Sequence, residues 1–279
     1  MRTFPAREFP ADRMVELKRG RTISVCLPAR DEQETVGDIV AAIRREFVEG
    51  TPLVDEILVV DDGSTDRTAA TAKAAGAKVR PVGAILPEVG FGQGKGEAMW
   101  KAVYEATGDL LVFCDADVRD FDPTFVVGLV GPLLTTDDLG FVKGFYDRPV
   151  EGRPGEGGRV TELVARPLLH LLFPDLAALR QPLAGECAAR REILERVPFV
   201  EGYGVDIGLV IDVAECFGRD VIGQVDLGTR IHRNRPLAEL APQATEVMQT
   251  ALSRAGIDTS FDISERPPWI DVPAYRKSA

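Results

Sequence analysis

From residue 22 onward, short runs of apolar residues alternate with longer amphipathic stretches, and this rhythm is the strongest constraint on the fold. The apolar runs have the length of strands and are apolar throughout, as strands buried on both faces of a sheet must be. The sequence therefore predicts an α/β fold of the Rossmann-like kind, with a mainly parallel sheet covered by helices on both faces. The expected strands are residues 22–28, 55–61, 78–82, 109–114 and 139–146, and the expected helices are residues 32–47, 66–75, 95–106 and 123–133.

A stretch rich in glycine, proline and charge, residues 150–158, interrupts this rhythm. Such a composition is typical of a loop or of the seam between two halves of a fold, and we interpret it as a lid or an acceptor-binding loop. Beyond it we expect helices over residues 159–172, 206–217 and 244–255 and a strand over residues 221–226. The chain is thereby divided into an N-terminal extension (1–21), a first half (22–149), a second half of the same domain (150–257) and a tail (258–279). The tail is polar and contains prolines, so we expect it to be either poorly ordered or used in oligomer contacts.

The composition argues against several classes of protein. The net charge of −11 is unfavourable for a broad nucleic-acid-binding surface, which needs clustered lysine and arginine, so an anionic small substrate would need a local basic pocket. The apolar runs are far shorter than the roughly 20 residues that span a bilayer, and the first residues do not resemble a signal peptide. We therefore expect a cytoplasmic protein without membrane segments. Four widely spaced cysteines are expected to be reduced thiols that form neither a disulfide nor a zinc site: Cys26, Cys114, Cys187 and Cys216.

Polar residues follow the predicted strands at their carboxyl ends, where ligands collect in parallel α/β sheets. One apolar run ends in Asp115 and Asp117, whose i and i+2 spacing on extended backbone places both carboxylates on one side. Such a pair can hold a hard divalent cation, Mg²⁺ with Mn²⁺ or Co²⁺ as alternatives, which would bridge the phosphates of a nucleotide diphosphate. Aspartates after strands also cap helices or form turns, and Asp117 fits that structural role equally well.

Two further segments suit a nucleotide. Asp61 and Asp62 end a buried strand, where a carboxylate is costly unless it is hydrogen-bonded or binds a ligand. They belong either to a well-formed strand-to-helix turn or to a contact for uracil, guanine or ribose. A glycine-rich stretch, residues 90–97, leads Lys95 into a helix, where backbone N–H groups and the ammonium can approach a diphosphate. It is not an ATP-binding P-loop, because Gly96 follows Lys95 where that motif requires Ser or Thr.

Four segments of the first half, in this order and spacing, resemble the donor-binding half of GT-A-type glycosyltransferases: PARDEQETVGDIV, VVDDGSTDRT, GQGKGEAMWK and FCDAD. Asp115-Ala116-Asp117 would be their DXD motif. Segments of the second half, at residues 158–167, 181–186, 202–208 and 231–236, resemble the family of glucosyl-3-phosphoglycerate synthase and its mannosyl relative. The resemblance implies a GT-A fold whose second half binds the acceptor, and it also implies a homodimer.

The resemblance further implies roles for individual residues. The donor would contact Pro28, Ala29, Glu32, Asp62, Ser64, Lys95, Asp115, Ala116, Leu183, Gly185 and Tyr203. The metal would be held by Asp117 and His232, and the phosphate and carboxylate of the acceptor by Gly158, Arg159, Thr161 and Asn234. The catalytic residues would be Lys95, Asp117 and Asp206, where Asp206 stands at a position at which the glucosyl enzymes are expected to carry Glu. Without the resemblance, His232 would be interpreted as structural, and Arg159 and Thr161 as the start of a helix.

The implied activity is transfer of a hexose, with its α-linkage retained, from a nucleotide sugar to the 2-hydroxyl of D-3-phosphoglycerate. UDP-glucose is the favoured donor. The alternatives are a mannosyl-3-phosphoglycerate synthase that uses GDP-mannose and a catalytically silent nucleotide-sugar-binding regulator. Since no carboxylate stands out as a nucleophile, we expect a same-face route in which the leaving diphosphate helps to deprotonate the acceptor, with the metal and Lys95 stabilising the charge that develops.

Overall fold

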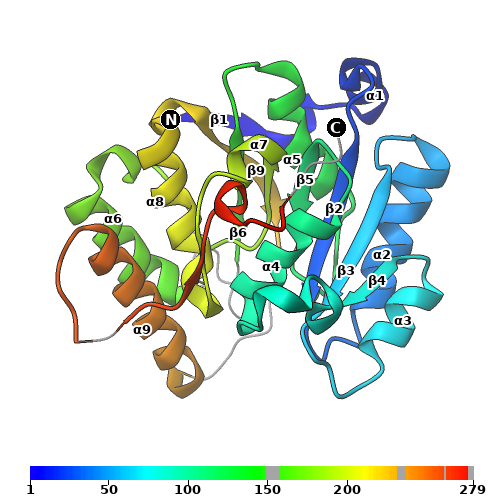
Figure 1. Ribbon diagram of the computed structural model, residues 1–279. Helices are drawn as coiled ribbons and strands as arrows, with labels where there is room; N and C mark the ends of the chain where they lie inside the picture. Colours follow the sequence, from blue (N-terminus) through cyan, green and yellow to red (C-terminus); the bar gives the residue numbers. More distant parts are fainter. Residues whose placement is uncertain (149–157, 231–236, 261, 276–279) are drawn as a thin grey trace.

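A single mixed sheet forms the centre of the molecule in the computed structural model, which describes residues 1–148, 158–230, 237–260 and 262–275. The strand order in the described residues is β1-β9-β6-β7-β5-β2-β3-β4 (Figure 1). Every neighbouring pair is parallel except the two that β7 makes with β5 and β6, which confirms the predicted mainly parallel α/β fold. The strands are β1 (Arg2–Pro5), β2 (Ile23–Ala29), β3 (Glu56–Asp61), β4 (Lys78–Pro81), β5 (Leu110–Phe113), β6 (Phe141–Asp147), β7 (Cys187–Arg190) and β9 (Ile222–Thr229).

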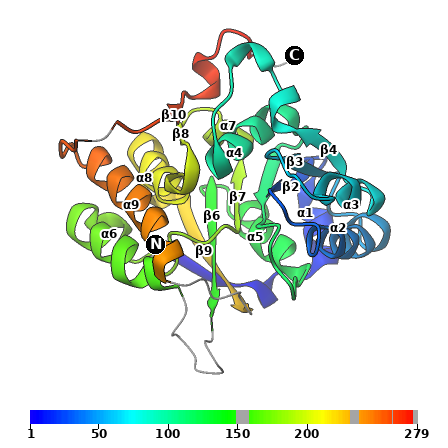
Figure 2. The ribbon, with the colours of Figure 1, turned by 90° about the horizontal axis from the view of Figure 1, so that it is seen from below.

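Helices cover both faces of this sheet. One face is covered by α1 (Ala11–Lys18), α2 (Val36–Arg44), α3 (Thr68–Ala74) and α5 (Thr124–Thr135). The other is covered by α4 (Gly94–Glu105), α6 (Arg166–Leu172), α7 (Arg191–Leu194), α8 (Val205–Phe217) and α9 (Leu237–Arg254). Helices α4 and α5 lie on opposite sides of the sheet in Figure 2. The molecule therefore has three layers and two hydrophobic cores.

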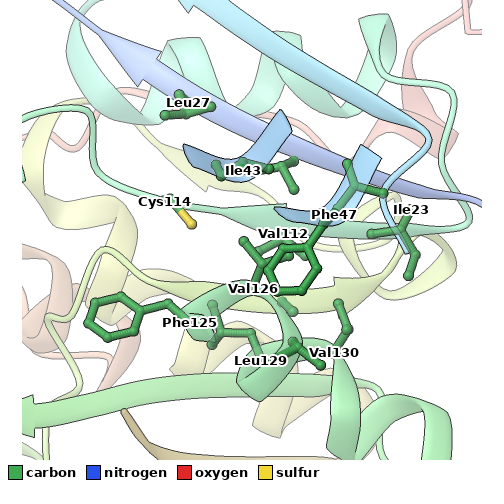
Figure 3. Packing of buried hydrophobic residues seen from close by; sticks show 14 of the residues in the cluster. Ile23, Leu27, Ile43, Phe47, Val112, Cys114, Phe125, Val126, Leu129 and Val130 are labelled. Carbon is green, nitrogen blue, oxygen red and sulfur yellow. The ribbon is translucent and has the colours of Figure 1, made fainter. Parts of the chain in front are cut away.

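The two cores are separated by the alternation of side chains along each strand. In β5, Leu110 and Val112 face one core, whereas Leu111 and Phe113 face the other. Figure 3 shows Val112 close to Phe47 and to the buried face of α5. Burying an aliphatic or aromatic side chain of this size contributes about 1.5–3 kcal/mol, so strands apolar on both faces stabilise the sheet from both sides.

The first 21 residues form part of this architecture, although the sequence analysis treated them only as an extension. Strand β1 pairs in parallel with β9 and forms the edge of the sheet. Helix α1 packs beside α5, and its Met14 is buried in the same core. The first residues of the chain thus share one sheet with β9, a strand of the second half.

Several predicted elements differ from the observed ones. Strand β7 was not predicted, and β6 and β9 are not apolar throughout, because they carry the buried polar residues Lys143 and Gln224. The helix expected from residue 32 begins at Val36 and continues as a π-helix, Arg45–Gly50. The helix expected over residues 159–172 is divided into a π-helical turn, Thr161–Ala165, and α6. The apolar pattern predicted the position of these helices but not their local winding.

Residues 262–275 of the tail are packed on the core, so the expectation of poor order is wrong for these residues. Strand β10 (Glu265–Arg266) pairs antiparallel with β8 (Phe199–Val200). Trp269 is completely buried and stacks on Trp100 of α4 with ring centroids 3.8 Å apart. Each indole N–H donates to a backbone carbonyl of the other segment, at Pro267 and Trp100.

Two other expectations concern absences. In the part of the chain that is described, no helix is both long and apolar enough to cross a membrane. The four cysteines are free thiols; three are buried in the cores and Cys216 is exposed.

Candidate functional site

A cavity of about 450 Å³ opens at the carboxyl ends of β2, β3 and β5, facing the N-terminal ends of α4 and α8. Its position agrees with the rule that ligands bind at this edge of parallel α/β sheets. Fourteen residues predicted for the site line it: Pro28, Ala29, Glu32, Asp62, Lys95, Asp115, Ala116, Asp117, Gly158, Arg159, Thr161, Leu183, Tyr203 and Asp206. The fold thus brings donor and acceptor candidates from distant parts of the chain to one cavity.

Four predicted residues are not among those lining the cavity. His232 and Asn234 lie outside the described residues. The Ser64 hydroxyl accepts a hydrogen bond from the Asp31 N–H at 3.0 Å, so Ser64 braces the loop that follows β2. Gly185 lies behind Asp115, where an added Cβ would come within 1.9 Å of a carboxylate oxygen. Only glycine therefore leaves room for the Asp115 side chain at this position.

The carboxylates of Asp115 and Asp117 converge although both residues lie beyond the end of the strand. Strand β5 ends at Phe113, Asp115 follows it, and Asp117 lies in the next turn. Both side chains contact one guanidinium group: Arg230 lies 3.3 Å from Asp115 Oδ2 and 3.1 Å from Asp117 Oδ1. The expectation that the i and i+2 spacing brings them together is met by this shared partner rather than by strand geometry.

Arg230 is the most informative residue that the sequence analysis did not assign to the site. It follows β9 and is almost completely buried, with 2% of its surface exposed. The guanidinium also donates to the Glu186 carboxylate at 2.7 Å and to the Tyr146 hydroxyl at 2.6 Å. Burial by itself lowers the pKa of Arg230, but Glu186 and the aspartates raise it well above its usual value. A permanent positive charge is therefore held beneath the two aspartates.

Lys95 connects Asp115 to the opposite wall of the cavity. Its ammonium lies 3.1 Å from Asp115 Oδ1 and 2.9 Å from Asp206 Oδ2. Burial alone would lower the pKa of Lys95, whereas the two carboxylates raise it well above its usual value. The same environment keeps the pKa of Asp115 well below its usual range, since Lys95 and Arg230 outweigh the effect of burial. Lys95, Asp115 and Arg230 are therefore charged at neutral pH.

The approach of α4 to the cavity depends on glycine. A Cβ on Gly96 would lie 1.9 Å from the carbonyl oxygen of Val200 in β8, so α4 can pack against β8 only with glycine at this position. Gly94 adopts a positive φ of 73°, which glycine tolerates without strain, and it begins the helix that carries Lys95. The glycine-rich stretch therefore brings a helix N-terminus and a lysine to the cavity edge.

The donor set suits a hard divalent cation. The side chains of Asp115 and Asp117 are 25% and 31% exposed. Within the described residues no group of three or more histidine, cysteine or acidic side chains forms a metal cluster. Two carboxylates together with diphosphate oxygens are nevertheless the usual environment of Mg²⁺, which rarely has an all-protein cage.

The remaining walls carry both predicted and unpredicted polar groups. Asp62 is half-buried, and burial raises the pKa of its carboxyl. The guanidinium of Arg30, a residue that was not predicted, lies 3.8 Å from Asp62 Oδ2. Arg148, also not predicted, lines the cavity near Gly158 and donates to the Tyr146 hydroxyl at 2.7 Å. Lys143 donates to Asp206 Oδ1 at 2.9 Å. Lys143 was not predicted either, although a charged residue inside an otherwise apolar strand is the sequence signal that could have identified it.

The chain is similar in sequence to known glycosyltransferases. The family model for glycosyl transferase family 2 matches residues 24–197. The glucosyl-3-phosphoglycerate synthase of Petrotoga mobilis is 43% identical over 297 residues, covering 95% of this chain and 91% of its own. That of Mycolicibacterium smegmatis is 53% identical over 247 residues, covering 87% of this chain and 80% of its own.

Solved structures extend the similarity to the fold. The glucosyl-3-phosphoglycerate synthase of Mycobacterium tuberculosis in complex with phosphoglyceric acid matches with a TM-score of 0.90 and 44% identity, over 97% of this chain and 98% of that chain. The same enzyme in complex with Mn²⁺, UDP-glucose and phosphoglyceric acid matches with a TM-score of 0.88, at the same identity and coverage. The GT-A fold expected from the motifs is therefore shared with solved structures of similar sequence.

Proposed function

The chain belongs to the glucosyl-3-phosphoglycerate synthase family of glycosyltransferases, and from this we propose that it transfers glucose from UDP-glucose to the 2-hydroxyl of D-3-phosphoglycerate. The observation that carries the proposal is the single cavity that joins Asp115, Asp117 and Lys95 to Arg159 and Thr161. The glucosyl enzymes among its relatives favour glucose over the GDP-mannose alternative. The alternative of a catalytically silent nucleotide-sugar-binding regulator is disfavoured, because the charged groups proposed to act on a diphosphate, Lys95, Asp115 and Asp117, are all present in the cavity.

The donor would lie along the edge formed by β2, β3 and β5. Pro28, Ala29 and Asp62 would contact the nucleoside, and Lys95 would contact the diphosphate. A divalent cation, Mg²⁺ or Mn²⁺, would be held by Asp117 together with His232 and would neutralise the leaving diphosphate. Mn²⁺ is bound in structures of the mycobacterial relative.

The acceptor would lie against the start of the helical segment after residue 157. Gly158, Arg159 and Thr161 line the cavity there, and Asn234 would complete this set. An acceptor with about three negative charges needs a guanidinium fork and hydroxyl donors, which Arg159 and Thr161 supply. Arg148 adds a second guanidinium beside them.

Asp206 is better suited to orient the sugar than to attack it. Both of its oxygens are held by ammonium groups, those of Lys95 and Lys143. A carboxylate fixed in this way is a weak nucleophile, and this favours the same-face route with retention of the α-linkage. Lys95 would stabilise the negative charge that develops on the leaving diphosphate.

A purified-enzyme assay tests the proposal by crossing UDP-glucose, GDP-glucose and GDP-mannose with 3-phosphoglycerate, with and without Mg²⁺ or Mn²⁺. We expect a phosphoglycerate-dependent glucoside with UDP-glucose and metal. Release of nucleotide diphosphate without any such glucoside would refute the acceptor assignment.

Asp117→Asn tests the metal site in the same assay. We expect it to lower kcat on the order of 100-fold, since charge-stabilising groups have effects of that size. Asp120→Asn, at an exposed position three residues later, is the matched control and should retain activity. Metal-dependent turnover of Asp117→Asn near that of the wild type would remove Asp117 from the metal site.

Two further expectations remain predictions. Light scattering of the purified chain tests the homodimer, for which the region after Asp226 and the helix 244–255 are the candidate contacts. A cytoplasmic location is a prediction from the sequence.

A further inference from the structure

Lys143 is a buried lysine whose charge is directed at the site rather than at solvent. It lies in the middle of β6, between Cys187 of β7 and Gln224 of β9 in the sheet register. Its side chain is 1% exposed, and its ammonium lies 2.9 Å from Asp206 Oδ1. Removing an ammonium from water is expensive unless a charged partner compensates for it. A methionine would fill a strand position of this kind without that cost, so the charge itself calls for an explanation.

Asp206 is fixed by two cations on two different elements. Lys143 on β6 holds Oδ1, and Lys95 on α4 holds Oδ2 at 2.9 Å. Asp206 is itself on the first turn of α8 and lines the cavity beside Tyr203 and Leu183. A carboxylate has about four acceptor positions, so two hydrogen bonds leave capacity for hydroxyl groups of a ligand.

Without Lys143, nothing described in the structure would keep Oδ1 of Asp206 turned toward the sheet. Asp206 would then be able to rotate and engage the Lys95 ammonium with both oxygens. That would change the direction of its remaining acceptor positions and hold Lys95 more tightly away from an incoming diphosphate. The Lys143 contact prevents both changes.

From this geometry we propose that Lys143 is a positioning residue, which fixes the Asp206 carboxylate in the orientation that binds the hexose of the donor. The inference rests on the proposed function, since it assigns Asp206 to the sugar portion of the nucleotide sugar. Lys143 acts through Asp206 and does not itself contact the substrate.

Binding of UDP-glucose and of UDP, each with Mn²⁺, tests the proposal by titration calorimetry without any acceptor. For Lys143→Met we expect the preference for UDP-glucose over UDP to fall about 10-fold, the effect of losing one charge-assisted hydrogen bond. An unchanged preference would overturn the proposal. If the wild type binds neither ligand, the proposed function fails instead, so the two failures are distinguishable.

Arg254→Met is the matched structural control. Arg254 Nε lies 2.6 Å from Asp212 Oδ1. Like Asp206, Asp212 is a buried carboxylate on α8, but it does not line the cavity. Its loss should lower thermal stability as Lys143→Met does, without changing the ligand preference. A similar loss of preference in Arg254→Met would show that general loosening of α8 explains the effect, and would overturn the positioning role.

Turnover in the Asp206→Asn background separates positioning from packing, and it does not require Lys143→Met to fold on its own. If Lys143 acts only through the Asp206 charge, Lys143→Met/Asp206→Asn and Asp206→Asn should have kcat values within about threefold of each other. The double variant also removes both buried charges together, which favours its folding. A kcat of the double variant more than about threefold below that of Asp206→Asn would contradict the proposal.

Discussion

At the residue scale, the site depends on charges that are buried and paired with one another. Arg230 illustrates this, because one guanidinium contacts Asp115, Asp117 and Glu186. Glu186 is fully buried, and burial raises the pKa of its carboxyl in spite of the nearby guanidinium. Removing one member of such a set leaves another charge uncompensated, whereas an exposed ion pair contributes little. Substitutions at the site must therefore be compared with controls that separate binding from folding.

Arg159 provides a test at this scale. Replacing it with alanine should raise the KM for 3-phosphoglycerate about 10- to 100-fold, since a hydrogen bond to a charged group contributes ~1.5–3 kcal/mol. The kcat should change little, because Arg159 is proposed to bind the acceptor and not the diphosphate. Initial rates with varied acceptor at saturating UDP-glucose and Mn²⁺ measure both constants.

Arg166→Ala is the control for that experiment. Arg166 lies seven residues later, pairs with Glu162 at 2.5 Å and lines a separate cavity. Its loss should leave the acceptor KM unchanged. An Arg159→Ala enzyme with a wild-type KM would exclude Arg159 from acceptor binding.

At the element scale, the segment Glu265–Asp271, here called the C-terminal strap, holds in place the helix α4 that carries Lys95. Its Arg266 donates to both oxygens of Glu97 on α4, at 2.6 and 3.0 Å, and to the Val89 carbonyl at 2.9 Å. Glu97 lies two residues after Lys95 on the same helix and is 1% exposed. The strap thus fixes the glycine-rich stretch and the helix that carries the lysine.

Arg266→Ala should destabilise the protein strongly. It leaves the Glu97 carboxylate buried without its bidentate partner, which typically costs about 3–5 kcal/mol. Thermal unfolding followed by circular dichroism measures the change. Arg219→Ala, which removes an exposed ion pair with Asp175, should shift the stability by less than about 1 kcal/mol. Equal effects of the two substitutions would show that the strap does not depend on Arg266.

The strap also shows where prediction from the sequence ends. The apolar rhythm predicted the strands and helices between residues 22 and 146 and placed polar groups at their carboxyl ends, because both follow from local patterns. Fourteen of the eighteen predicted site residues line one cavity, but those beyond residue 146 were assigned through the family resemblance and not through the apolar rhythm. Contacts such as Arg266 with Glu97, 169 residues apart, leave no local pattern. Strand β7 is short and is flanked by charged residues, so it lacked the apolar run that identified the other strands of the sheet interior.

At the scale of the whole molecule, the two halves inferred from the sequence do not form separate sheets. Strands β7 and β9 of the second half lie on either side of β6, and β7 separates β6 from β5. Strand β1 closes the edge beside β9. Since strands from the extension and from both halves share one sheet, neither half has a complete core of its own. The described chain should therefore unfold as one cooperative unit.

Glu56 connects this unit across several elements and makes its stability depend on pH. The carboxylate on β3 accepts hydrogen bonds from the Ser24 hydroxyl at 2.6 Å, the Thr107 N–H at 2.8 Å and the Lys78 ammonium at 3.1 Å. Burial alone would raise the pKa of Glu56, but these donors lower it below its ordinary value of 4.5. A carboxyl whose pKa is lowered by folding stabilises the folded state above its unfolded pKa, and this contribution is lost as the pH falls below about 4.5.

Glu56→Gln should consequently lower the free energy of unfolding by about 1–3 kcal/mol at pH 7, where the charged hydrogen bonds are present. The difference between wild type and variant should shrink at pH 3, because the Glu56 carboxyl of the unfolded wild-type chain is protonated below about pH 4.5 and this favours unfolding. Urea unfolding at both pH values, followed by tryptophan fluorescence and by far-ultraviolet circular dichroism, measures the two free energies and shows whether unfolding is one transition. Glu46→Gln, at an exposed position, should change the stability little at either pH. A Glu56→Gln effect that is as large at pH 3 as at pH 7 would mean that shape and packing, rather than the carboxylate charge, hold these strands together.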